Sequence, residues 1–457
     1  MPDALNNWRA EGWRDRPWAW AVHYPDHAAL TRAEKRLAEF PPLVTSGEIE
    51  RLRTFLAEAE EGKRFYLQGG DCAETLADCT PDVITAKLKI LLQMSLVLVY
   101  AGKMPVVRIG RLAGQYSKPR SSATETRTVD GREVTLPSYF GDLVNKSAFT
   151  ADARRPDPDL MVQGYQHAAV TLNFIRSLLD AGFGAVNHPE NWDLSFLKHA
   201  GLHDQTRARY QTLVDRIGEG LKFMSALVDA ERNDSLRRAE FFTSHEGLNL
   251  YYEQAQTRTV PRRTGHYNLT THLPWIGDRT RALDGPHVEF FRGVRNPLGV
   301  KIGAGITPDE LLRLVARLNP ANEGGKVVLT PRLGANNVER VLPALVQSVQ
   351  RAGLKVLWVC DPMHGNGLTT DNGTKTRSFD DILRELLLSW DVHRAHGSRL
   401  GGVHVELTGE DVTECIGGAG GMNEEHLSRN YASLCDPRLN YEQALELAFA
   451  LADKMQG

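Results

Sequence analysis

The chain has 457 residues, of which 42% are hydrophobic and 24% are charged, and its formal net charge is −3. This composition is typical of a soluble globular protein with one large domain or two, and the small net charge gives no reason to expect nucleic acid or a membrane surface as a partner. Five cysteines are few and odd in number, which argues against a secreted disulfide scaffold and predicts a cytoplasmic protein. The longest apolar run, Ile90–Tyr100, is too short to span a bilayer.

The first 63 residues are predicted to form an N-terminal arm. Ala28–Glu39 and Glu48–Glu61 have the apolar spacing of helices, and the turn-like Phe40-Pro41-Pro42 lies between them. We expect the remaining residues, 64–457, to form one large domain.

Beyond the arm, apolar runs alternate with amphipathic helical patterns. Eight runs have the length and composition of strands: Phe65–Gln68, Pro105–Ile109, Glu240–Thr243, Leu273–Ile276, Leu298–Ile302, Val327–Pro331, Val356–Val359 and Gly402–Leu407. Strands that are mostly followed by helices indicate parallel βα units, and continuous apolar runs fit strands that are covered on both faces. The sequence therefore predicts an α/β fold, a (β/α)8 TIM barrel.

Two helix starts are signalled by capping residues. Thr80 precedes a proline in the first turn of its helix, and Thr307 lies three residues before Glu310, which makes a capping box.

The connection between the second and third strands is too long for one crossover helix. We therefore expect an inserted helical pair at about 190–235. One face of this insertion carries an apolar stripe, formed by Tyr210, Leu213, Val214, Ile217, Leu221, Met224 and Val228. Packing on the barrel wall and a regulatory or oligomer surface both remain open for this stripe.

Four short segments each carry one good metal ligand in glycine-rich or turn surroundings. The candidates are Cys72, His364, Glu406 and Asp436. Ligands at the ends of separate strands are what a metal-dependent barrel enzyme needs, and a mixed donor set suits a catalytic divalent cation better than a structural zinc. The alternatives are a buried thiol, a turn histidine and a turn-starting aspartate; Glu406, among apolar neighbours, is the hardest to explain without a partner.

Cationic side chains lie at or just after the predicted strands: Arg111, Lys118, Arg120, Arg279, Lys301 and Arg332. Each arginine alone is more simply explained by a salt bridge or by solvent. Lys301 differs, because a lysine inside an apolar strand must be paired or face a polar barrel mouth. Together these residues predict a site for more than one anionic group, such as phosphate and carboxylate.

Five longer motifs resemble one family, the type II (class II) 3-deoxy-D-arabino-heptulosonate 7-phosphate (DAHP) synthases. These motifs are Leu67–Thr75, Gly114–Ser121, Trp275–Thr280, Cys360–Asn366 and Thr413–Gly418. The resemblance implies a metal-dependent condensation of phosphoenolpyruvate with erythrose 4-phosphate, the first step of the shikimate pathway. The implied metal is Mn or Co, with Zn or Fe as alternatives.

The resemblance also implies roles for individual residues. Cys72, His364, Glu406 and Asp436 would be the metal ligands. Arg111, Arg279, Lys301 and Arg332 would hold phosphoenolpyruvate, and Arg120 with Ser121 would hold the phosphate of erythrose 4-phosphate. Asp278 would be a further substrate-binding residue. Lys118 would lie between the two substrates, and the catalytic residues would be Lys118, Lys301 and Arg111.

Four stretches depart from the family pattern: Gly303–Ile306, Pro331, Asn187–Trp192 and Phe140–Asp142. They leave open whether the second substrate is erythrose 4-phosphate or its imino analogue, and whether aromatic amino acids inhibit the enzyme. The alternatives are a homologue that makes DAHP or amino-DAHP for an antibiotic or pigment pathway, and a catalytically dead regulatory homologue.

We expect a homo-oligomer, and the resemblance allows a chorismate mutase as partner. Cys435 precedes Asp436, so we further expect that oxidation can bridge it to Cys72.

Overall fold

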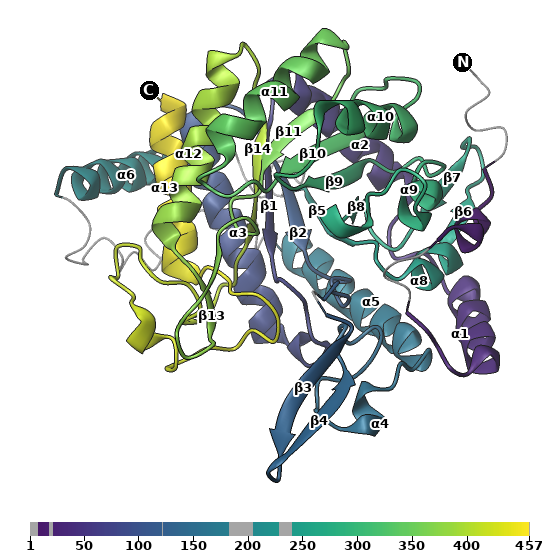
Figure 1. The fold of residues 1–457 in the computed structure, drawn as a ribbon. Helices are drawn as coiled ribbons and strands as arrows, with labels where there is room; N and C mark the ends of the chain where they lie inside the picture. Colours follow the sequence, from purple (N-terminus) through teal and green to yellow (C-terminus); the bar gives the residue numbers. More distant parts are fainter. Residues whose placement is uncertain (1–7, 18–21, 121, 182–203, 228–239, 457) are drawn as a thin grey trace.

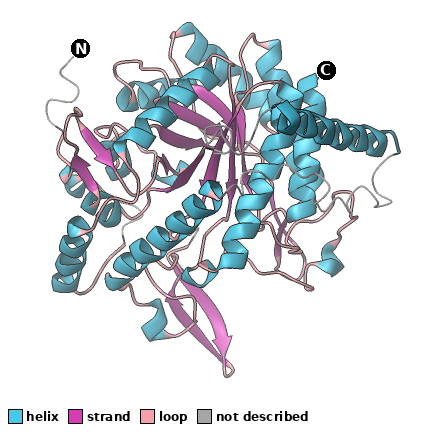
Figure 2. Cartoon of the chain, turned by 180° about the vertical axis from the view of Figure 1, so that it is seen from behind, coloured by secondary structure: helices cyan, strands magenta, loops and turns pink. Residues whose placement is uncertain are grey.

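The computed structural model describes residues 8–17, 22–120, 122–181, 204–227 and 240–456, and its centre is a closed barrel of eight strands (Figures 1 and 2). Every pair of neighbouring strands is parallel, and their order around the barrel follows the chain. The strands are β1 (Phe65–Gly70), β2 (Val106–Arg111), β5 (Phe241–Glu246), β8 (Leu273–Ile276), β9 (Leu298–Ile302), β10 (Val327–Pro331), β11 (Leu357–Cys360) and β14 (Gly402–Glu406). The predicted TIM barrel is therefore confirmed.

Three strands extend two or three residues further at their carboxyl ends than predicted, and β11 extends one residue further, to Cys360. β1 continues to Gly70, β2 to Arg111 and β5 to Glu246. The added residues in β5 are polar but buried, and Gln68 Nε2 donates a 2.6 Å hydrogen bond to Ser244 Oγ. An apolar-run criterion ends such strands too early, because polar side chains line the barrel mouth.

A helix follows every barrel strand and covers the outside of the barrel (Figure 2). These helices are α3 (Pro81–Gly102), α5 (Asp159–Asp180), α8 (Leu250–Ala255), α9 (Pro286–Phe291), α10 (Pro308–Leu318), α11 (Val338–Arg351), α12 (Phe379–Ala395) and α13 (Tyr441–Gln456). Both predicted helix starts are present. Thr80 caps α3 and Thr307 forms a capping box with Glu310, whose backbone N lies 3.2 Å from Thr307 Oγ1.

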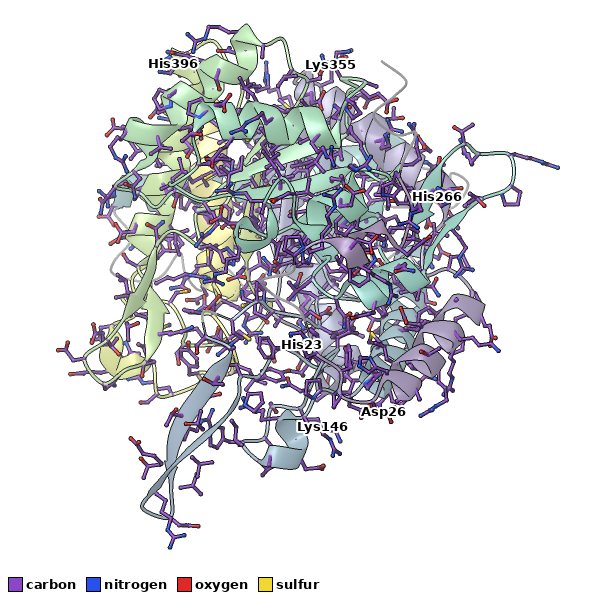
Figure 3. The ribbon with its side chains drawn as sticks, turned by 45° about the vertical axis from the view of Figure 1, so that its right-hand side comes forward. His23, Asp26, Lys146, His266, Lys355 and His396 are labelled. Atoms are coloured by element: carbon purple, nitrogen blue, oxygen red, sulfur yellow. The ribbon has the colours of Figure 1, made fainter. Side chains whose placement is uncertain are left out.

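The N-terminal arm supplies α1 (His27–Glu39) and α2 (Ser46–Glu60), and α2 closes the amino end of the barrel. Leu52 and Leu56 join one buried cluster with Val107 and Val328 of the barrel. Gly325, just before β10, donates a 2.8 Å hydrogen bond to Glu60 Oε1. In Figure 3, Lys355 and His396 mark the loops of this end, and Lys146 lies toward the opposite, carboxyl end.

Smaller elements decorate the loops. Three hairpins are β3 (Thr124–Val129) with β4 (Arg132–Pro137), β6 (Thr257–Thr259) with β7 (His266–Asn268), and β12 (Gly367–Thr369) with β13 (Lys375–Arg377). The first projects away from the barrel (Figure 1). Short helices are α4 (Ala151–Arg154) and the 3-10 turns Gly12–Asp15, Leu76–Asp78, Asp278–Thr280 and Glu424–His426.

Within the predicted insertion, the described residues form one long helix, α6 (Asp204–Leu227). Four residues of its apolar stripe are buried in the same cluster as α3 and α13, namely Tyr210, Leu213, Val214 and Ile217. The Tyr210 and Phe449 rings lie 4.9 Å apart. The rest of 190–235, the Val228 end of the stripe and the departure at Asn187–Trp192 lie outside the described residues. This part of the stripe packs on its own barrel wall and gives no independent reason to expect a second subunit there.

Among the described residues, α3 is the one helix long and apolar enough to cross a membrane by length and composition. It packs against α13, β1 and β2, and Leu88, Leu91 and Leu98 are buried. A core helix of a barrel has the same composition, so this is weak evidence for a membrane span.

Candidate active site

Four predicted ligands converge at the carboxyl end of the barrel. Cys72 follows β1, Glu406 ends β14, and Asp436 lies in the loop before α13; one ligand atom from each of these three residues lies within 4.8 Å of the other two. His364, after β11, places its Nε2 2.9 Å from Glu406 Oε1. Residues that are far apart in sequence meet because the carboxyl ends of parallel strands share one end of the barrel.

The cluster has the properties of a cation site. The Lys118 ammonium lies 2.8 Å from Cys72 Sγ, 2.8 Å from Asp436 Oδ2 and 3.6 Å from Glu406 Oε1, so the donors already face one positive charge. Glu406 Oε1 is buried and accepts no hydrogen bond of good geometry. This donor set fits a divalent transition metal, because it combines a soft thiolate, an imidazole and two carboxylates. One carboxylate oxygen, Glu406 Oε1, has no hydrogen-bond donor and is available to a metal.

Positive charges hold the carboxylates of this cluster ionised. Burial of Glu406 favours its neutral form, but His364, Lys118, Arg377 and Arg111 outweigh burial and hold its pKa well below the usual range. Arg377 Nη1 lies 2.7 Å from Glu406 Oε2. Both ligand carboxylates therefore carry charge at neutral pH, because Lys118 likewise lowers the pKa of Asp436.

The two thiols near the cluster differ in their surroundings. Cys72 and Cys435 belong to one small buried cluster with Tyr139, and both are free. Burial raises the pKa of the Cys72 thiol, whereas a hydrogen bond with Cys72 lowers the pKa of Cys435 to about 7. The predicted oxidative bridge between them stays a prediction.

A cavity of about 240 Å³ adjoins the ligand cluster. Water takes about 30 Å³ in the liquid, so the cavity has room for a small organic anion. Its charged lining is mostly positive, and consists of Lys118, Arg279, Lys301, Arg332, Lys375 and Arg377 together with Glu246, Asp278, His364 and Asp436. Four of the predicted cations are thus brought together around one cavity.

Lys301 is a buried cation of this lining and belongs to the barrel strand β9. Its ammonium pairs with Asp361 and lies 3.1 Å from His404 Nε2. Burial lowers the pKa of Lys301 to about 8, with Asp361 opposing the shift. Burial, Lys301 and Arg111 hold the pKa of His404 well below its usual value, so its imidazole is neutral and its Nε2 accepts both hydrogen bonds.

Arg111 connects the ligand cluster to the cations. It is completely buried; its Nη1 lies 2.7 Å from His404 Nε2, and its Nη2 donates to Cys72 O at 2.9 Å and lies 3.1 Å from Glu406 Oε1. Asp278 supports the opposite wall, where its Oδ1 accepts from Gly303 N at 2.8 Å and its Oδ2 lies 3.6 Å from Arg332.

The predicted phosphate pair at Arg120 and Ser121 is not part of the described cavity lining. Arg120 Nη1 donates to Cys435 Sγ at 3.3 Å, which places it beside the ligand loop. Ser121 lies outside the described residues.

Four residues of the site were missed from the sequence: Glu246, Lys375, Arg377 and His404. Glu246 lines the cavity, its Oε1 is buried without a hydrogen bond, and burial raises its pKa to about 7. It was missed because β5 was predicted to end at Thr243. His404 could have been found, since it lies two residues before Glu406 and so faces the same side of β14.

Comparison with known proteins identifies the family of the chain. The model of the class-II DAHP synthetase family matches residues 8–452. A phospho-2-dehydro-3-deoxyheptonate aldolase of Neurospora crassa is 47% identical over 462 residues, covering 98% of this chain and 94% of that protein. The enzyme of the same name from Streptomyces coelicolor is 45% identical over 442 residues, covering 96% of each chain, and one from Mycolicibacterium smegmatis is 44% identical over 437 residues, covering 94% and 91%. The chain therefore belongs to the class-II DAHP synthetase family, and the kind of enzyme predicted from its sequence, a DAHP synthase, is confirmed.

Proposed function

We propose that the chain catalyses the metal-dependent condensation of phosphoenolpyruvate with erythrose 4-phosphate, giving DAHP and phosphate as the first step of the shikimate pathway. The observation that carries this proposal is the position of the ligand cluster beside a cavity lined by cations. One substrate of this reaction carries a phosphate and a carboxylate, and the other carries a phosphate and an aldehyde. A metal next to an anion pocket matches that combination.

Cys72, His364, Glu406 and Asp436 would hold the metal, Mn or Co by preference and Zn or Fe as alternatives. When bound, such an ion supplies Lewis acidity that polarises a carbonyl oxygen. Binding of a divalent ion by the two carboxylates would also free Lys118 from its contacts with them. Lys118 would then be available to orient both substrates and to donate a proton to the new alkoxide.

The cations around the cavity would bind phosphoenolpyruvate. Arg279 and Arg332 offer planar forks for phosphate and carboxylate oxygens, and Lys301 offers a point charge. Arg111, fixed behind them by His404 and Cys72 O, would add positive charge from the inner wall, and Asp278 would hold Arg332 in place. Arg120 and Ser121 would bind the phosphate of the second substrate from the neighbouring loop.

Glu246 is the group best suited to activate water. The methylene carbon of phosphoenolpyruvate attacks the aldehyde carbon, and the carbon that bears the phosphate becomes cationic. Water adds there and gives one proton to the Glu246 carboxylate. The carbon–oxygen bond to phosphate then breaks as the new hydroxyl becomes the keto group and its proton passes to the departing phosphate. A base with a pKa of about 7 matches such a proton transfer at neutral pH.

Phosphate release with two second substrates would test the proposal. Metal-loaded protein is assayed with phosphoenolpyruvate plus erythrose 4-phosphate, and plus its imino analogue. We expect rapid phosphate release with erythrose 4-phosphate. Preference for the imine would instead support an amino-DAHP synthase of an antibiotic or pigment pathway, and no release with either would support a catalytically dead regulatory homologue.

Assembly and location complete the proposal. We expect a homo-oligomer in the cytoplasm that is able to associate with a chorismate mutase, on the strength of the family resemblance. Sedimentation at micromolar protein concentration would test the first point, since a monomer would contradict it. Titration of activity with phenylalanine, tyrosine and tryptophan would test feedback control.

A further inference from the structure

Behind the ligand cluster, four buried charged residues form a continuous ionic chain. Lys87 of α3 pairs with Asp71, and Arg438 Nη1 donates to Asp71 Oδ1 at 2.6 Å. On its other side, Arg438 donates to Glu414 through Nη2 at 2.8 Å and through Nε at 3.1 Å. Asp71 and Glu414 are fully buried, and Arg438 is 7% exposed.

The two middle members of this ionic chain, Asp71 and Arg438, lie in the segments that carry the candidate ligands. Asp71 immediately precedes Cys72, and Arg438 lies two residues after Asp436. Glu414 also accepts backbone hydrogen bonds from Ser433 N at 2.8 Å and from Arg438 N at 2.7 Å. It therefore shapes the loop that contains Cys435 and Asp436.

The bridge needs an arginine. A planar guanidinium can donate to two carboxylates on opposite edges at once, whereas a lysine ammonium is a point charge without that fixed fork. The distances and angles of these hydrogen bonds set the separation of Asp71 and Glu414. Apolar side chains of equal volume would not fix that separation. Because both partners are buried, neither has water to replace a lost hydrogen bond.

We propose that Arg438 is a positioning residue of the metal site. Arg438 itself does not line the described cavity, and it acts through Asp71 and Glu414 on the relative placement of Cys72 and Asp436. The proposal rests on the function proposed above, because it assigns a role in holding the metal of that reaction. Residues that support metal ligands from behind typically change metal affinity about 10- to 100-fold when replaced.

The test compares R438K with R292K. Arg292 is a matched control, because it is 8% exposed and pairs through Nε and Nη2 with the buried Glu289 of α9, away from the ligand cluster. Three quantities are measured for each variant and for the unaltered chain. They are the Mn²⁺ dissociation constant from electron paramagnetic resonance of free Mn²⁺, the thiolate-to-cobalt absorption of the Co²⁺-loaded protein, and the melting temperature without metal.

We expect both variants to melt at lower temperature, but only R438K to bind Mn²⁺ at least about tenfold more weakly and to lose thiolate-to-cobalt absorption. Unaltered Mn²⁺ affinity in R438K at a lowered melting temperature would overturn the proposal and leave Arg438 a purely structural role. If R438K does not fold, E414Q, which keeps one oxygen for the backbone donors, should weaken Mn²⁺ in the same direction, and unaltered affinity would equally overturn the proposal. A failure of the unaltered chain to bind Mn²⁺ would instead overturn the proposed function on which this inference rests.

Discussion

Two lysines are buried at opposite ends of the barrel, and their surroundings differ. Lys326, just before β10 at the amino end, donates to Val294 O at 2.5 Å and Asn296 O at 2.6 Å, and burial holds its pKa well below the usual value. Lys301, at the carboxyl end of β9, pairs with Asp361 beside the cavity and has a pKa of about 8. A lysine that is buried with only backbone carbonyl acceptors, such as Lys326, is favoured as a neutral amine that hydrogen-bonds to neighbouring backbone. Burial beside a carboxylate and an open cavity leaves a cation for an anionic ligand.

The same contrast holds for the half-buried Glu60 and the buried Glu246. Burial raises the pKa of Glu60 and of Glu246 to about 7. Glu60 Oε1 accepts a hydrogen bond from Gly325 N at the amino end. Glu246 lines the cavity, and its buried Oε1 has no hydrogen bond. A similar pKa thus accompanies a structural role at one end and a chemical role at the other, and the difference is access to a ligand.

The largest expected effect is loss of the metal, which acts at the carboxyl end only. Treatment with a chelator should abolish phosphate release, and Mn²⁺ or Co²⁺ should restore it. The reason is that no other cation near the cluster has the Lewis acidity of a divalent metal ion. C72S should weaken metal binding, since thiolate is the softest donor present. Full turnover by rigorously metal-free protein would reject the mechanism.

Removal of the proposed base is the next largest effect. E246Q should lower kcat by about 100-fold or more, the usual contribution of a general base. In the unaltered enzyme the carboxylate exists above pH of about 7, so kcat/KM should fall as pH drops below 7, and E246Q should lack this fall. E60Q is the matched control from the amino end and should keep it. Identical pH profiles for E246Q and the unaltered enzyme would remove Glu246 from the mechanism.

Lys301 should matter for activity and Lys326 for stability. K301A removes a charge-assisted hydrogen bond worth about 1.5–3 kcal/mol, so kcat/KM for phosphoenolpyruvate should fall at least tenfold. K326M leaves two buried carbonyls without their donor, at a cost of about 1–3 kcal/mol in the free energy of unfolding, with kcat/KM little changed. Steady-state kinetics and urea denaturation measure both. Equal losses of kcat/KM in the two variants would contradict the distinction between the two ends.

The charge of Lys301 also predicts an alkaline limb. With a pKa of about 8, Lys301 is protonated below pH 8 and loses its charge above it, so kcat/KM for phosphoenolpyruvate should decline by up to about tenfold per pH unit above 8. K301R keeps its charge at all accessible pH and should be less active at pH 7 but flat to pH 9. A decline that persists unchanged in K301R would assign the limb to another group.

The smallest effect is expected at Arg120. It lies outside the described cavity lining, so R120A should raise the apparent KM for erythrose 4-phosphate severalfold and leave that for phosphoenolpyruvate unchanged. A rise in the KM for phosphoenolpyruvate alone would show that the cations are divided between the substrates differently.

The barrel could be predicted from its apolar runs, because all eight strands are buried on both faces. The carboxyl ends could not, since β5 continues through Ser244 and His245 to Glu246 with no apolar signal, and the functional residues lie there. The contacts between charged side chains that are far apart in the chain could not be predicted from the sequence either. Nothing local indicates that Arg377 of a short hairpin contacts Glu406, or that Arg438 joins Asp71 to Glu414.

The central claim is that one metal lies among four strand-end ligands beside a cation-lined cavity that binds phosphoenolpyruvate. Crystals grown with Mn²⁺ and phosphoenolpyruvate, with anomalous diffraction at the manganese edge, test it directly. We predict one strong anomalous peak bonded to Cys72, His364, Glu406 and Asp436, with phosphoenolpyruvate density against Lys301. A peak at other residues, or phosphoenolpyruvate bound elsewhere, would contradict the account.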